Sequence, residues 1–144
     1  MTKTCDRTEF EQMDIFGIGE PNPWGEFFSG ASFLKFLTAE GCAASVANVS
    51  FEPGCRNNWH VHNATSGGGQ VLICTAGEGW YQEWGKLAQS LVPGTVVTIP
   101  AGVKHWHGAK AGSWFSHLAV EVPGEEASNE WLEPVSDEEY AALA

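Results

Sequence analysis

The chain has 144 residues, a hydrophobic fraction of 43% and seven tryptophans, which suits one domain with an ordered core and is too small for two. Its formal net charge is −11, and a field of that sign repels phosphate backbones, so nucleic acid is not an expected partner. No apolar run approaches the roughly 18 residues of a membrane span, and the charged N-terminus does not resemble a secretory signal. We therefore expect a cytoplasmic protein that does not associate with membranes. Its four cysteines are widely and irregularly spaced, which predicts reduced thiols rather than a zinc knuckle or redox motif.

Turn-forming residues divide the chain into an N-terminal arm over residues 1–30, a barrel over 31–124 and an acidic C-terminal segment over 125–144. The arm is expected to lie over the barrel or over a neighbouring subunit. In the last segment, Ser136 and Glu139 have the spacing of a capping box and predict a short helix. Nine strands are predicted within the barrel, over residues 32–37, 44–51, 58–62, 70–76, 79–84, 87–91, 95–99, 104–109 and 115–121.

The breakers between these strands suit tight turns, for example Pro53-Gly54 and Pro93-Gly94. Strands joined by tight turns pair antiparallel, and many short ones favour a closed architecture that leaves few exposed edges. The sequence therefore predicts an all-β fold, either a closed barrel or a double-sheet jelly roll.

The histidines of the chain all fall in predicted strands; they are His60, His62, His105, His107 and His117. Residues two apart on a strand share a face, so each closely spaced pair points in one direction. The tryptophans at positions 59 and 106 take the opposite face, which predicts an outer tryptophan layer and an inner cavity lined by imidazoles. Buried imidazoles need partners, and a metal ion or water would supply them.

Alternation along the next strand allows Gln70 to join these imidazoles. Imidazoles and an amide oxygen form a borderline nitrogen and oxygen site, suited to one divalent Mn, Fe, Co, Ni, Zn or Cu ion. The set contains no carboxylate, so a bound ion would keep its positive charge and act as a strong Lewis acid on a hydroxyl group or water.

Two stretches resemble the sequence motifs of the cupin family. Gly54-Cys-Arg-Asn-Asn-Trp-His60-Val-His62, followed by residues 70–77, is similar to the first motif, and residues 94–105 are similar to the second. Most cupins have a glutamate after the His-x-His pair, whereas Gln70 stands there in this chain, as in a subgroup of small bacterial manganese cupins. The best-known activity of that subgroup is hydroxynitrile lyase. Further likeness to it lies in residues 50–54, 105–108, 116–119 and 131–135.

This resemblance implies a cupin β-barrel with manganese as the favoured metal and with two histidines, His107 and His117, left unligated in the cavity. The implied metal ligands are His60, His62, Gln70 and His105. One feature departs from the family pattern, because residues 63–69 make an expanded turn before Gln70. Asn63 is therefore an alternative ligand to Gln70, and the glycines of the turn could form a mobile lip.

The lyase resemblance implies that a cyanohydrin is cleaved to an aldehyde and cyanide, with an unligated histidine removing the hydroxyl proton. His117 is the first choice for this base and His107 the second, while Glu121 is expected on the face of His117 at the barrel mouth. Two alternatives stay open: an iron-dependent dioxygenase-type cupin, and a non-catalytic cupin that binds a metal or small ligand.

The family resemblance also implies a small-molecule substrate and a homodimer. Aromatic residues of the arm, such as Trp24, Phe27 and Phe28, are expected to be exposed and to favour self-association.

Overall fold

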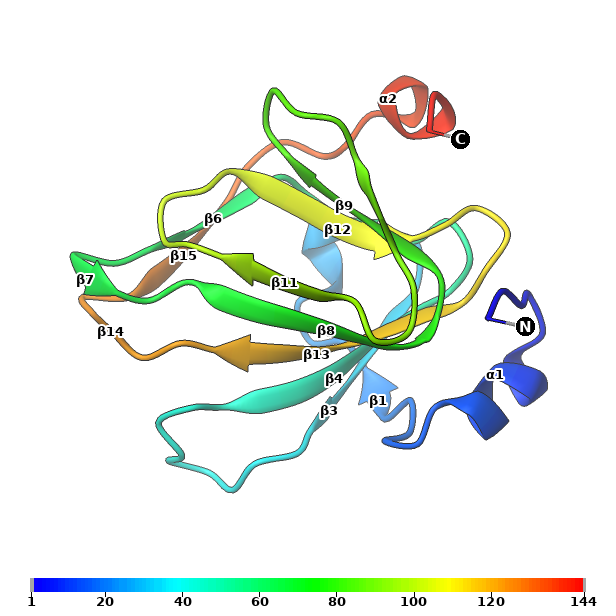
Figure 1. Ribbon diagram of the computed structural model, residues 1–144, viewed down its shortest axis with the longest axis horizontal. Helices are drawn as coiled ribbons and strands as arrows, with labels where there is room; N and C mark the ends of the chain where they lie inside the picture. Colours follow the sequence, from blue (N-terminus) through cyan, green and yellow to red (C-terminus); the bar gives the residue numbers. More distant parts are fainter. Residues whose placement is uncertain (1, 144) are drawn as a thin grey trace.

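The computed structural model describes residues 2–143 as two packed antiparallel sheets, a small two-stranded sheet and a short helix near each end of the chain (Figure 1). The predicted all-β architecture is confirmed, and each predicted strand is present within two residues of its expected bounds. These strands are β3 (Ser32–Phe36), β4 (Val46–Phe51), β6 (His60–Asn63), β8 (Gln70–Gly77), β9 (Gly79–Glu83), β10 (Gln89–Leu91), β11 (Val96–Ile99), β12 (His105–Ala109) and β13 (Phe115–Glu121).

The remaining elements are short, and all but the last helix were missed by the sequence analysis. They are α1 (Arg7–Met13), β1 (Glu20–Pro21), a 3-10 turn (Gly25–Phe27), β2 (Phe28–Ser29), β5 (Arg56–Asn57), β7 (Ser66–Gly67), β14 (Gly124–Glu125), β15 (Ser128–Trp131) and α2 (Asp137–Ala141). Most have only two or three residues, too few for a hydrophobic repeat to become visible.

One sheet has the strand order β1-β3-β4-β13-β8-β11. The other has the order β10-β9-β12-β5-β2, and β6 joins it by pairing with both β12 and β15. Apolar side chains fill the space between the sheets, among them Phe51, Leu72, Leu91 and Phe115, each at most 1% exposed. This core adjoins a cavity, because Val49 and Ala119 belong to the core and also line the cavity.

A separate cluster lies on the outer side of β12. Trp59 and Trp106 pack there with Val135, and Tyr140 of α2 lies over Trp106 with ring centroids 6.1 Å apart. The predicted outer tryptophan layer is therefore confirmed, and the capping box at Ser136 does begin a helix. Within the described residues, no helix has the length and apolar character needed to cross a membrane.

The N-terminal arm packs on the barrel of its own chain. Phe10 of α1 is fully buried and stacks on Trp114 at a centroid distance of 5.4 Å. Asp14, at the end of the helix, accepts a 2.9 Å hydrogen bond from the Ser116 hydroxyl on β13. Of the aromatic residues expected to be exposed, only Trp24 is so, because Phe27 stacks on Trp131 and Phe28 packs on Phe51.

Candidate metal centre

Three imidazoles meet at the junction of β6 and β12. His60 and His105 are direct cross-strand partners, and His62 lies two residues along β6 on the same face. The ring centroids of His60 and His105 are 4.1 Å apart, and one ring nitrogen from each of the three side chains lies within 4.8 Å of the others. All three residues are at least 93% buried. The predicted convergence of these residues is present in the structure.

Each of these rings is oriented by an oxygen that can only accept a hydrogen bond. Nδ1 of His60 lies 2.8 Å from the Asn58 carbonyl oxygen, and Nδ1 of His105 lies 2.9 Å from that of Val103. Nδ1 of His62 lies 2.8 Å from the side-chain oxygen of Asn129. The three Nδ1 atoms must therefore carry the protons, which leaves the lone pairs on the Nε2 atoms.

The Nε2 lone pairs fit a metal ion. Within residues 2–143, the buried Nε2 atoms of His62 and His105 have no hydrogen-bond partner. Burial lowers the pKa of His105 to about 4, and burial together with the neighbouring His105 lowers that of His60 well below its usual value. The rings of His60 and His105 are therefore neutral at neutral pH, as metal ligands must be. A divalent cation would satisfy nitrogen atoms that would otherwise be costly to bury.

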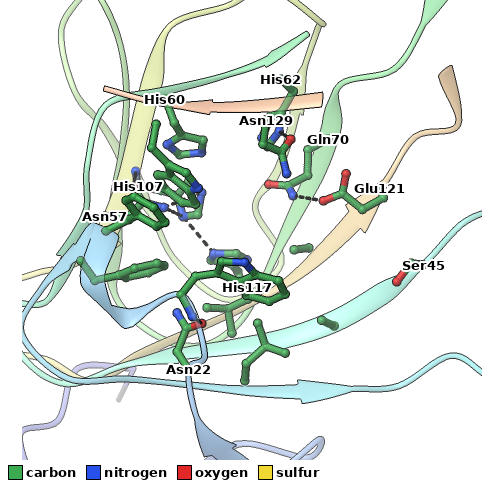
Figure 2. Close-up of a pocket in the computed structure, with 18 of the residues that line it drawn as sticks. Asn22, Ser45, Asn57, His60, His62, Gln70, His107, His117, Glu121 and Asn129 are labelled. Carbon is green, nitrogen blue, oxygen red and sulfur yellow. Dashed lines mark hydrogen bonds between the residues drawn. The ribbon is translucent and has the colours of Figure 1, made fainter. Parts of the chain in front are cut away.

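Gln70 begins β8 and lines the same cavity. Its Nε2 donates to Oε1 of Glu121, which is its direct partner on β13, at 2.5 Å. Figure 2 shows the amide oxygen of Gln70 turned into the cavity on the side of the histidines. The alternative residue, Asn63, instead donates to Glu130 at the exposed surface.

The long turn between His62 and Gln70 is held against the C-terminal segment. Its short strand β7 pairs with β14, so the turn is anchored rather than a free lip. Gly69 has φ +88°, and a Cβ there would collide with the backbone oxygen of Ile99. Only glycine therefore permits the close passage that brings the chain back into β8 at Gln70.

A second pair of buried histidines lines the same cavity. Nε2 of His117 is 3.0 Å from Nδ1 of His107, as Figure 2 shows. The backbone N–H of His107 donates to the Asn57 side-chain oxygen, which turns the Asn57 amide nitrogen toward Nε2 of His107, 3.1 Å away. This contact assigns the His107 proton to Nδ1, which donates to His117. Nε2 of His117 accepts that bond, so it carries the lone pair and the proton of His117 lies on Nδ1.

The cavity has a volume of about 690 Å³ and reaches from these histidines to the open end of the sandwich. Its walls are largely apolar, and the stacked rings of Phe27 and Trp131, with centroids 4.7 Å apart, form one side. His107, His117 and Glu121 line it together with Gln70, as the sequence predicted. This shape and lining suit a small, partly aromatic compound held next to several polar groups.

Two residues of the site were missed by the sequence analysis. Asn129 orients His62 from β15, a strand within the acidic C-terminal segment, where only a short helix was predicted. Asn57 orients His107 from the two-residue strand β5. Neither residue lies in a recognisable motif, and only the pairing of β15 with β6 and of β5 with β12 brings them to the histidines.

Comparison with known proteins agrees with this geometry. The model of the cupin family matches residues 22–142. The chain is 44% identical over 117 residues to an (R)-mandelonitrile lyase of Granulicella tundricola. The aligned region covers 80% of this chain and 86% of that protein. It is 39% identical to a cupin-like protein of Thermotoga maritima of known crystal structure, with a TM-score of 0.78 and coverage of 90% and 97% of the two chains.

A cupin 2 conserved barrel protein of Rhodopseudomonas palustris shares only 17% identity, with a TM-score of 0.63 over 82% of this chain and 77% of that one, and so supports the fold alone. The family match spans most of the chain, and the barrel carries both expected histidine motifs. The protein belongs to the cupin family.

Proposed function

We propose that this cupin is a metal-dependent lyase that cleaves an aromatic cyanohydrin of the mandelonitrile class into an aldehyde and cyanide. The observation that carries the proposal is the set of three Nε2 lone pairs, from His60, His62 and His105, that converge beside a second histidine pair in one apolar cavity. The similarity to the Granulicella tundricola lyase points to the same chemistry.

His60, His62, His105 and Gln70 would hold the metal, with manganese as the favoured ion. A divalent ion bound there would supply Lewis acidity toward the hydroxyl oxygen of the substrate. The cavity supplies the remaining functions. Its stacked aromatic wall would hold the substrate ring, and the apolar lining would exclude water from the reacting carbon.

His117 is the proposed base. Its Nε2 lone pair accepts the Nδ1–H of His107 in the structure, and a bound substrate hydroxyl would replace that contact. Nε2 would then take the hydroxyl proton as the carbon–carbon bond breaks and its electron pair leaves with cyanide. His107 would support this step, because its Nδ1–H stabilises the imidazole of His117 in the required tautomer. Burial lowers the pKa of His117 to about 4, so the ring is neutral and its Nε2 is unprotonated at neutral pH.

The test of function combines elemental analysis with a cleavage assay on mandelonitrile. The expected result is about one divalent metal ion per chain and cyanide release that chelation abolishes and manganese restores. His117→Ala should retain the metal and lose about 10²- to 10⁴-fold in kcat, which is the range for a removed general base. Full activity of that variant with metal retained would exclude His117 as the base.

The same experiments separate this function from the two alternatives. Stoichiometric iron, with oxygen consumption in place of cyanide release, would favour a dioxygenase. Tight metal binding without turnover of either kind would favour a binding protein. Neither alternative explains the second histidine pair as directly as proton transfer does.

We also propose that the protein is a cytoplasmic homodimer. All of its cysteines are free thiols in the described residues, which fits a reducing compartment. Trp24 and Phe36 line the cavity and are 46% and 60% exposed, and contact with a second copy would cover such apolar surface. Cell fractionation and sedimentation analysis test the two statements, and a monomer at all concentrations would contradict the second.

A further inference from the structure

Gln70 and Glu121 form an isolated polar pair at the edge of the cavity. They are direct neighbours on β8 and β13, at the end of the register that joins these strands. Both line the cavity, and the amide nitrogen of Gln70 donates to the carboxylate of Glu121 at 2.5 Å. The pair therefore links the proposed metal centre to a carboxylate, Glu121, that is not itself one of the proposed metal ligands.

The chemistry of the pair allows only one orientation of the amide. A carboxylate accepts hydrogen bonds and cannot donate them, so it must face the nitrogen end of Gln70. The reversed amide would place two oxygens against each other and would turn the NH₂ group toward the three-histidine cluster. With the nitrogen held by Glu121, the oxygen is directed into the cavity (Figure 2).

We propose that Glu121 is a positioning residue for the metal centre, which holds the Gln70 oxygen toward the position enclosed by His60, His62 and His105. This inference rests on the proposed metal site. Glu121 also contributes a negative charge beside a ligand set that has none, so it would favour a divalent transition-metal cation over an empty site.

The test measures the affinity of the purified chain for Mn²⁺ and Zn²⁺ by competition with a chelating indicator. Glu121→Leu should weaken binding about 10- to 100-fold, the usual effect of losing a group that orients a ligand. Glu121→Gln keeps an acceptor oxygen for the Gln70 amide and should recover part of the loss. Glu125→Leu, which removes an exposed carboxylate on β14, the next strand along the chain, is the matched control and should leave affinity unchanged.

A double-mutant cycle with Gln70→Ala separates positioning from charge. If Glu121 acts through the Gln70 amide, Glu121→Leu should have little further effect on affinity once Gln70 is alanine. An equal loss in both backgrounds would mean that only the charge matters and would overturn the positioning role.

The remaining outcomes distinguish this inference from the function on which it depends. Absence of stoichiometric metal binding by the parent chain would remove the metal centre itself. Tight binding by the parent and equally tight binding by Glu121→Leu would overturn the inference alone and leave the centre intact. Circular dichroism of each variant verifies folding, and should Glu121→Leu fail to fold, the same cycle is measured with Glu121→Ala, whose unchanged affinity would overturn the inference.

Discussion

Residues 105 and 106 are neighbours in β12, both fully buried, yet they face two different environments. Trp106 points outward into a cluster with Trp59 and Val135, and its Nε1–H donates to Gln82 at 2.9 Å. His105 points inward, and its Nε2 has no partner among the described residues. Burial is equal on the two faces, so the difference lies in hydrogen bonding. The indole N–H of Trp106 on the outer face already has its hydrogen-bond partner, whereas Nε2 of His105 on the inner face would gain a partner only from a bound ligand.

The largest effect is expected from His105→Ala. This change removes one of three imidazoles and should abolish stoichiometric metal binding, and with it cyanohydrin cleavage, because two imidazoles and an amide hold a divalent ion poorly. Its unfolding free energy without metal should change less than that of the outer-face variant described next. Elemental analysis and the cleavage assay provide the measurement, and retention of both properties would contradict the metal centre.

Trp106→Ala should have the opposite profile. Removing a fully buried tryptophan should lower the unfolding free energy by about 3–5 kcal/mol through lost contacts and the cavity left behind. Molecules that remain folded should still bind metal at the parent ratio. Urea denaturation and metal analysis of the same sample test both statements, and loss of metal without loss of stability would show that the two faces are not independent.

Asn129→Ala gives a smaller effect on the inner face alone. The imidazole of His62 loses the oxygen that holds its Nδ1–H, so affinity for Mn²⁺ should fall about 10-fold. Asn63→Ala is a matched control on the paired strand, because its amide bonds Glu130 at the surface. Indicator competition should show a change only for Asn129, and equal affinities in the two variants would exclude an orienting role.

The smallest effect concerns the pH dependence of stability without metal. Burial lowers the pKa of His117 from 6.5 to about 4. The folded state then binds this proton less readily than the unfolded chain, so the contribution of His117 to stability is present above pH 6.5 and is lost as the pH falls toward 4. His117→Gln should flatten the decline in urea midpoint over this range. A slope equal to that of the parent would contradict the assignment.

Much of the fold was predictable because its signals are local. Glycine and proline turns mark the ends of β4, β8 and β11, and alternation over residues 59–62 and along β12 separates tryptophans from histidines. The same alternation predicted that His60, His62 and His105 share a cavity. The cupin motifs then favoured one of the two histidines of β12 as a ligand, which alternation alone could not do.

The parts that escaped prediction depend on long-range pairing. β15 contains only one large apolar residue, Trp131, and becomes a strand because it pairs with β6. Asn129 and Asn57 acquire their roles only through such pairings. The helix α1 is a single short amphipathic segment, fixed mainly by burial of Phe10 against Trp114. For α1, only the cap of Asp6 on the Glu9 backbone N–H gives a local signal.

The position of β15 has a consequence for biosynthesis. His62 receives its orienting oxygen from Asn129, a residue added to the growing chain 67 positions later. While the ribosome is still adding residues beyond β12, the imidazoles can approach one another, but the ring of His62 is free to rotate. Metal binding is therefore expected only after the C-terminal segment has left the ribosome. β15, the last strand to be synthesised, then fixes the orientation of His62.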